Sequence, residues 1–308
     1  MSVLQHATGP DVAIRFAQPH ERLRAFIPAY WDIIVTGEGV VEDLLRPEWT
    51  AIRLVSSGSA EYGPSLGAMT SREEPAFVHG VATHAQWVRA SEGSVFSIPV
   101  FPMGWHRLLG VKASKFANVI RPLADILGGE ADRLLAAVKA ADSLEGRVSA
   151  ADAFFLERLD ASKRTSVSAL IEAVSLAVAD PDCATVAELA ERAKLSQPQL
   201  ARLCLAHFGF TPKKLIRRER FLRMLHSMQG MSVGEWPHFL DPQYTDQSHM
   251  IRDFKHFIGM APTRYFAMER PFLAAVFKTL MNLINEGKTD GLRIEEGRQV
   301  LAFRPDDS

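Results

Sequence analysis

Side chains that can pair with nucleic-acid bases and phosphates gather in the carboxyl-terminal part of this 308-residue chain. Gln and Arg can each make two hydrogen bonds to a base edge, whereas Lys and Arg hold phosphate oxygens. Between Arg192 and Leu225 there are nine Lys or Arg and a single Glu, although the formal net charge of the chain is −1. Such segregated charge is typical of a surface that contacts a phosphate backbone; a solvated helix face is the alternative.

The elements that must position these side chains form an internal repeat. S-x-x-x-L-x-R-x-C-x-x-x-F-G-F-T-P from Ser196 to Pro212 corresponds to D-x-x-x-M-x-R-x-F-x-x-x-I-G-M-A-P from Asp246 to Pro262. A period of about 50 residues that ends each time in G-x-x-P is rarely produced by chance. It predicts two helix-turn-helix units, each with an insertion helix, joined by a basic helix from Pro212 to about Ser227.

The first unit carries its own start and stop signals. Ser196 is expected to cap the insertion helix, with Pro198 in its first turn, and Gly209 is expected to end it. Thr211 is expected to cap the basic helix. Apolar residues at helical spacing predict the buried face of the preceding helix: Val186, Leu189, Ala190 and Ala193.

Residues 166–270 resemble the DNA-binding domain of the AraC/XylS family of transcription regulators. The family pattern A-x-x-x-x-[LV]-S-x-x-x-L-x-R is matched at Ala190, Leu195, Ser196, Leu200 and Arg202. The pattern G-[YF]-x-[DS]-x-S-H-F-x-R-x-F-K-x-x-x-G-x-x-P is matched at Tyr244, Asp246, Ser248, His249, Arg252, Phe254, Lys255, Gly259 and Pro262. The resemblance implies insertion helices in successive major grooves on one face of DNA, where grooves recur about every 34 Å.

Within this resemblance, side-chain chemistry assigns roles along both units. Arg is the commonest partner of guanine and Gln can pair with adenine. Base contacts are therefore predicted from Gln197, Gln199, Arg202, Gln247, Ser248, His249 and Arg252. Phosphate contacts are predicted from Thr211, Lys213, Arg217, Arg218 and Lys255. Arg220 has two interpretations, a phosphate contact or internal packing.

Three departures from the family pattern carry expectations of their own. Lys194 stands where the turn usually has glycine, so it must adopt a left-handed or near-bridge conformation. At Cys204 the usual aromatic residue is missing, which indicates a smaller core. Pro237 and Pro242 interrupt the segment from Ser232 to Tyr244, where a regular helix is usual. We therefore expect the first unit to dominate DNA binding.

The amino-terminal half shows short β-rich runs over residues 26–108, which predict an antiparallel sheet folded as a barrel or sandwich. This half resembles the cupin-like sensor of many AraC-like regulators. Three tryptophans are candidates for lining a small-molecule cavity, with core packing as the alternative: Trp31, Trp87 and Trp105.

The chain is thus predicted to be α+β, with a β-rich domain over 1–160, an all-α double helix-turn-helix domain over 166–270, and an extension over 271–308. The extension contains an amphipathic helix from Phe272 to Ile284 and a candidate strand.

Between the β-rich runs and a linker expected at Asp160 to Ser168, the pattern is helical. Its apolar residues recur at roughly helical spacing: Leu134, Leu135, Val138, Leu144, Phe154, Phe155, Leu156 and Leu159. In the family such helices commonly pair two subunits, so the resemblance implies a homodimer as one interpretation. Packing of these helices against the chain's own sheet is the other.

Several features bear on the class of function. No apolar run has the length of a membrane span, the start lacks a signal-peptide pattern, and the two cysteines, Cys183 and Cys204, favour a reducing cytoplasm. No nucleophile elbow, P-loop or dinucleotide fingerprint is present. His79 and His84 are five residues apart, which on one strand places them on opposite faces, and with His106 they form no metal-ligand pattern. We therefore expect no metal, no cofactor and no enzymatic activity.

The interpretation favoured by these residues is a cytoplasmic transcription regulator that binds double-stranded DNA and responds to a small-molecule effector in its amino-terminal domain. RNA polymerase is a further candidate partner. One alternative is a sensor or interaction protein whose DNA-binding domain has lost or weakened DNA binding. The other is a metal-dependent cupin enzyme.

Overall fold

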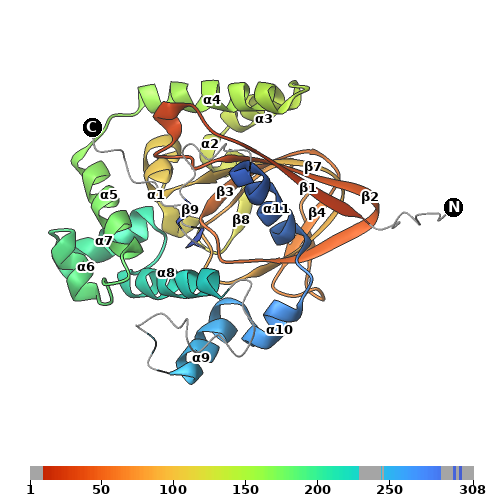
Figure 1. The fold of residues 1–308 in the computed structure, drawn as a ribbon. Coiled ribbons are helices and arrows are strands. Elements are labelled where there is room, and N and C mark those ends of the chain that lie inside the picture. The colour runs from red at the N-terminus through yellow and green to blue at the C-terminus, as the bar shows by residue number, and fades with distance from the viewer. Residues whose placement is uncertain (1–9, 229–243, 245, 286–293, 296–297, 300–308) are drawn as a thin grey trace.

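The computed structural model describes residues 10–228, 244, 246–285, 294–295 and 298–299, in which an antiparallel sheet with covering helices leads into a helical domain (Figure 1). The predicted α+β class is confirmed. We call residues 10–161 the sheet domain and residues 166–267 the helical domain. The strands are β1 (Asp11–Ala17), β2 (Tyr30–Leu45), β3 (Thr50–Ser57), β4 (Ala60–Gly63), β5 (Thr70–Ser71), β6 (Ala76–His79), β7 (Gln86–Val100) and β8 (Ile120–Pro122).

The sheet has the strand order β1-β2-β7-β3-β6-β8, and β4 pairs with β7 and carries β5. The register of the two long strands, β2 and β7, shifts between Val35 and Val40. That stretch contains Gly37 and Gly39 at φ angles of 89° and 107°, a conformation that glycine adopts readily, so the irregular pairing is built there. The edge strands β1 and β8 do not pair with each other, so the described sheet is open and does not close into a barrel.

Helices cover the sheet and complete its core. They are η1 (Glu21–Leu23), α1 (Pro102–Gly104), η2 (Trp105–Leu109), η3 (Ala113–Lys115), α2 (Ala124–Leu127), α3 (Glu130–Lys139) and α4 (Leu144–Ala161). Ile52 and Phe96 of the sheet share one buried cluster with Leu134 of α3 and Phe155 of α4. The apolar faces of α3 and α4 therefore pack against the chain's own sheet, one of the two interpretations that their pattern allowed.

The helical domain contains the two predicted units. Its helices are α5 (Ser166–Ala179), α6 (Val186–Arg192), α7 (Gln197–His207), α8 (Pro212–Ser227), α9 (Gln247–Phe257) and α10 (Pro262–Ala267). Ser196 caps α7, Pro198 lies in the first turn, and Gly209 follows α7 at a φ of 80°, all as predicted. Ser196 also forms a capping box with Gln199, which was not predicted. The proline-interrupted segment that was expected to weaken the second unit lies outside the described residues, apart from Tyr244.

The turn between α6 and α7 contains the predicted left-handed residue. Lys194 has a φ of 53°, and its backbone N–H donates to the Glu191 carbonyl at 2.9 Å. The Leu195 N–H donates to the Ala190 carbonyl, also at 2.9 Å. These bonds satisfy carbonyls at the end of α6 and hold Lys194 in a conformation that costs a residue with a Cβ atom about 1 kcal/mol.

The helical domain docks on the sheet domain through α8. Arg218 of α8 is fully buried, and its guanidinium donates to the carbonyls of Pro47 at 3.1 Å and Ala82 at 2.8 Å. The same guanidinium lies 4.5 Å from the centre of the Trp49 ring. Gly209 also meets the sheet domain, because a Cβ atom there would come within 2.6 Å of the Val81 side chain.

The chain then returns to the sheet domain. Where the amphipathic helix was predicted, the structure has α11 (Pro271–Asn285), which lies against β1 (Figure 1). In the predicted strand region, β9 (Ile294–Glu295) and β10 (Arg298–Gln299) form a short antiparallel pair.

Replacing Lys194 with glycine is expected to raise the free energy of unfolding by about 0.5–1 kcal/mol, because glycine adopts a positive φ without a Cβ clash. Urea denaturation would measure the change. The matched control is Lys194→Ala, which removes the same side chain but keeps the Cβ atom and should give no gain. Equal stabilisation by both variants would show that the side chain, and not the backbone conformation, is responsible.

Candidate nucleic-acid interface and ligand cavity

The first insertion helix, α7, presents the predicted base-reading residues at its exposed start. Gln197, Gln199 and Arg202 are all exposed. The side chain of Gln199 is already engaged within the protein, because its oxygen accepts hydrogen bonds from the Ser196 N–H at 2.9 Å and from the Ser196 hydroxyl at 2.8 Å. Gln197 and Arg202 are therefore the members of this set best placed to reach a base.

The second insertion helix, α9, exposes Gln247, Ser248 and Arg252. Asp246 caps its start by accepting from the His249 N–H at 2.7 Å. The His249 ring lies partly buried, 4.9 Å from the Tyr244 ring and with Nε2 3.2 Å from an Arg220 nitrogen. The predicted base contact from His249 would require this packing to change.

A buried carboxylate joins α9 to α8, and sequence reasoning missed it. Asp253 is fully buried, and its Oδ1 accepts two hydrogen bonds from Arg217, at 2.9 and 2.7 Å. Its Oδ2 accepts from Arg220 at 3.2 Å and from the Tyr244 hydroxyl at 2.9 Å. Burial, and then the Asp253 charge, raise the pKa of Tyr244, which keeps this hydroxyl a donor. The available signal was an acidic residue beside Phe254 on the inward face of an insertion helix.

The polar and basic residues predicted to hold phosphates differ in their surroundings. Thr211 and Lys213 at its start are exposed, as is Lys255 on α9, so all three can reach a phosphate. Arg217 is partly exposed but bound to Asp253, and Arg220 takes the internal role that was its second interpretation. The phosphate contact predicted for Arg218 is wrong, because this side chain is fully buried against the sheet domain.

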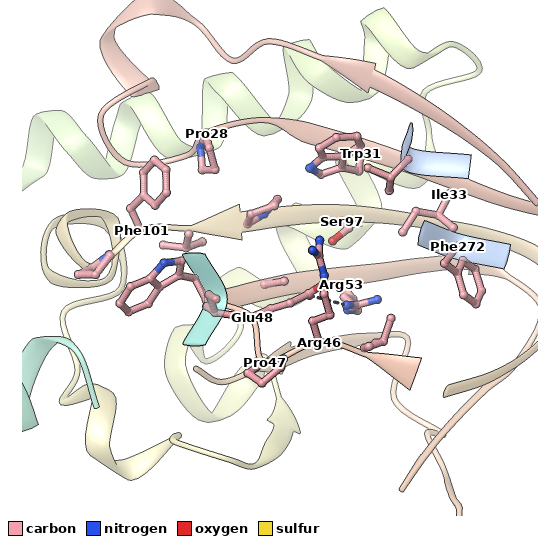
Figure 2. A pocket seen from close by; sticks show the side chains of 18 of the residues that line it. Pro28, Trp31, Ile33, Arg46, Pro47, Glu48, Arg53, Ser97, Phe101 and Phe272 are labelled. Atoms are coloured by element: carbon pink, nitrogen blue, oxygen red, sulfur yellow. Dashed lines mark ion pairs between the residues drawn. The ribbon is translucent and has the colours of Figure 1, made fainter. Parts of the chain in front are cut away.

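A cavity of about 740 Å³ lies between the sheet, α5, α8 and α11; we call it the central cavity (Figure 2). Its walls are largely apolar and include Trp31, Ile33, Val55, Val95, Leu222 and Phe272. Of the three tryptophans predicted to line a cavity, only Trp31 is in this wall. Trp105 is buried in the sheet-domain core, where its ring N–H donates to the Val111 carbonyl, and Trp87 packs against the cluster around α9.

Positive charge is concentrated in the middle of this apolar cavity, where Figure 2 shows Arg46 and Arg53. Arg53 is 7% exposed, and its one ion pair among the described residues, with Glu48, is long at 3.6 Å. Buried Nη1 of Arg46 and Nε of Arg53 have no hydrogen-bond acceptor among the described residues. Burial and the nearby Arg46 charge lower the pKa of His226 in the same wall to about 3, so this histidine is neutral.

Two histidine pairs cross the boundary between the domains. The rings of His84 and His256 lie 5.1 Å apart, and those of His106 and His207 lie 4.8 Å apart. Burial lowers the pKa of all four side chains, and the partner histidine lowers it further for His84 and His207; the pKa of His207 falls to about 4. In the first pair, the charge of Lys214 lowers both pKa values and that of Arg217 lowers the pKa of His256, whereas Asp253 raises the pKa of His256. In the second pair, the charge of Arg107 lowers the pKa of His106.

The matches to known proteins agree with this geometry. Residues 189–268 match the model of a helix-turn-helix domain, and with two capped insertion helices joined by a basic helix they form an AraC-type helix-turn-helix domain. No curated protein sequence matches the chain. Among the described residues, no helix is long and apolar enough to cross a membrane, and no group of three or more metal-binding side chains is found.

Solved structures of ToxT from Vibrio cholerae and of the AraC-like transcriptional activator CuxR are similar at low identity. ToxT from strain O395 is 12% identical, with a TM-score of 0.41, over 83% of this chain and 96% of ToxT. ToxT from strain SCE256 with a bound unsaturated fatty acid is 14% identical, with a TM-score of 0.40, over 86% and 97%. CuxR is 14% identical, with a TM-score of 0.30, over 74% and 91%.

Acid is expected to destabilise the protein through the interdomain histidines. Their pKa values are lowered in the folded chain, so the stability they contribute is present above the ordinary histidine pKa of about 6.5. This stability is lost as the pH falls from about 6.5 through the lowered pKa values of the folded chain. For His207, about 1 kcal/mol should be lost between pH 7 and 5, after allowance for solvent screening. Urea denaturation at each pH would measure this.

The His207→Gln variant should lose less stability than the wild type over this pH interval. His20→Gln is the control, because His20 is exposed and lies away from the boundary. Equal pH dependence in the wild type and His207→Gln would contradict the assignment.

Proposed function

We propose that the protein is a sequence-specific DNA-binding transcription regulator controlled by a small molecule. The observation that carries the DNA-binding part is the pair of capped insertion helices, α7 and α9, each with an exposed arginine, Arg202 or Arg252. Arginine can bond to both acceptors on the guanine edge. Lys213, Lys255 and the start of α8 at Thr211 would hold phosphates and fix the orientation of the helices.

We further propose that both units read DNA. The sequence alone favoured a dominant first unit, because prolines interrupt the segment before α9. The three hydrogen bonds that Asp253 accepts from Arg217 and Arg220 of α8 provide a support for α9 that does not depend on that segment. A helix already fixed in place loses little conformational entropy on binding, so more of its contact energy remains as affinity.

Arg202→Ala and Arg252→Ala should each weaken binding to a natural site by about 1–3 kcal/mol and reduce sequence preference, because each removes a base contact. A footprint on the protein's own upstream DNA would first locate the site, and fluorescence anisotropy at fixed salt would then give the affinities. The control is Lys139→Ala, an exposed charge on α3, which should bind like the wild type.

Wild-type affinity and selectivity in Arg202→Ala would reject that residue as a base contact. A far smaller loss of DNA affinity in Arg252→Ala than in Arg202→Ala would instead support a dominant first unit. No binding of the upstream DNA by the wild type, even at low salt where phosphate contacts are strongest, would favour the alternative of a sensor that has lost DNA binding.

The effector that we propose is an amphipathic carboxylic acid in the central cavity. An apolar cavity of about 740 Å³ has the size of small-molecule sites. The buried nitrogens of Arg46 and Arg53 that lack an acceptor favour an anionic ligand, because a buried donor of a charged group is costly to leave unpaired. Since α8 of the helical domain forms part of the wall, an occupied cavity would be in direct contact with the helix that joins the two units.

Arg53→Gln should weaken the binding of dodecanoate by about 10- to 100-fold, the value of a charge-assisted hydrogen bond. Isothermal calorimetry would measure it. Methyl dodecanoate, which keeps the apolar chain and lacks the charge, should bind the wild type weakly and show no further loss in the variant. Equal affinity of the acid and the ester for the wild type would reject the proposed role of the arginines.

A further inference from the structure

Helix α11 leaves the helical domain and packs on the sheet domain, although it directly follows the second unit in sequence. The Thr279 hydroxyl donates to the Ile14 carbonyl of β1 at 2.7 Å. Ala275 and Leu280 are buried, whereas Lys278 and Met281 are exposed. The helix therefore has one face on the sheet domain and one in solvent, as its amphipathic sequence requires.

The start of α11 is fixed by a buried carboxylate of the sheet domain. Asp43 of β2 is 2% exposed, and its Oδ2 accepts from the backbone N–H groups of Phe272 at 2.8 Å and Leu273 at 3.4 Å. These N–H groups have no partner within the helix, so Asp43 caps α11 from a distant part of the chain. Burial raises the pKa of Asp43, and these hydrogen bonds, with the nearby Arg270, oppose that shift.

The same helix is connected stiffly to the second unit. Only residues 268–270 separate α10 from α11. Within this connection the Arg270 guanidinium lies 4.5 Å from the centre of the Tyr265 ring and 5.6 Å from that of Phe266, both on α10. Tyr265 is fully buried in the cluster that also holds Phe254 of α9. A displacement of α11 therefore acts on α10 and, through this cluster, on the second insertion helix.

Three residues of α11 line the central cavity: Phe272, Val276 and Leu280. They are four residues apart and so lie on one stripe of the helix. In Figure 2, Phe272 lies toward one end of the cavity, Phe101 toward the other, and Arg53 between them. An acid whose carboxylate is held at the arginines and whose apolar chain extends toward Phe272 would end against α11.

We propose that α11 is the end wall of the effector site, that it sets the length of apolar chain the site accepts, and that it transmits occupancy to the second helix-turn-helix unit. This inference rests on the proposed effector function and assigns a role to a segment beyond the helix-turn-helix domain. Packing density explains the length limit, because a chain one or two methylenes too long must push α11 away from β1 or stay unbound. Displacement of α11 is also the step that would move α10.

The length limit is tested with octanoate, dodecanoate and hexadecanoate as probes, by calorimetry on the full chain. Val276→Trp should fill the end of the cavity, weaken hexadecanoate by at least about tenfold and leave octanoate within about twofold. Val276→Ala should shift the preference toward hexadecanoate, and this variant keeps the test open if the larger residue disturbs folding. Lys278→Trp, on the exposed face of the same helix, is the matched control and should bind all three acids like the wild type.

Transmission is tested with a Gly-Ser-Gly-Ser insertion between Met268 and Glu269, which loosens the connection but leaves the cap at Asp43 intact. Dodecanoate should bind this variant within about twofold of the wild type, while the change in DNA affinity that dodecanoate causes in the wild type should disappear. The same insertion between Ala141 and Asp142, in the turn between α3 and α4, should preserve the change.

The outcomes separate the two proposals. If the wild type binds none of the three acids, the proposed effector class is wrong, and the role of α11 fails with it. If the acids bind and the Val276 variants keep the wild-type order of chain lengths, the effector proposal stands and α11 is not the end wall. If the insertion between Met268 and Glu269 keeps the full DNA response, or the wild type shows none, α11 does not transmit occupancy.

Discussion

The burial of Arg218 is the constraint on which the arrangement of the two domains depends. A guanidinium removed from water must find acceptors. Arg218 pairs with the adjacent Glu219 of α8, and its other acceptors are the Pro47 and Ala82 carbonyls, with the Trp49 ring against its face. Pro47, Trp49 and Ala82 belong to two separate loops of the sheet domain. Separating the domains would leave both carbonyls and the cation to water, whereas a small rotation of α8 would leave them unsatisfied inside the protein. The contact therefore favours one docking orientation over nearby ones.

The same rule, that a buried charge must be paired, organises the second unit. Asp253 requires donors, and Arg217 and Arg220 supply them from α8, so the helix that docks on the sheet domain also fixes α9. Basic residues on α8 thus differ in role according to the face they occupy. Lys213 remains exposed to solvent, Arg217 and Arg220 bind Asp253 of the second unit, and Arg218 binds the sheet domain. Helix α8 thus connects the sheet domain to both helix-turn-helix units.

The sequence predicted what depends on local chemistry. The cap at Ser196, the positive φ of Lys194 and the bounds of the basic helix follow from rules that act within a few residues, and the structure confirms them. The contacts of Arg218, Asp253 and Trp105 depend instead on which surfaces pack together after folding. An arginine in a basic run looks the same in sequence whether it faces phosphate or a distant loop. A small-molecule cavity with Trp31 as a lining candidate was predicted, but the extent of the central cavity was not, because its walls come from segments more than 200 residues apart, such as Ile14 and Leu280.

The central cavity lies beside the helices that these contacts hold, so a ligand bound there, as we propose, would have a physical route to the insertion helices. Its walls include Leu176 of α5, Leu222 of α8 and Val276 of α11, so an occupant would touch three of the helices that contact the sheet domain. Packed interiors respond to an added group by shifting whole elements, because side chains have little free volume in which to yield. The insertion helices themselves contribute nothing to the cavity. A bound effector, as we propose, would therefore act on α7 and α9 through the helices that line the cavity, which are α5, α8 and α11. Of these, α8 and α11 are held by the sheet domain through Arg218 and Asp43.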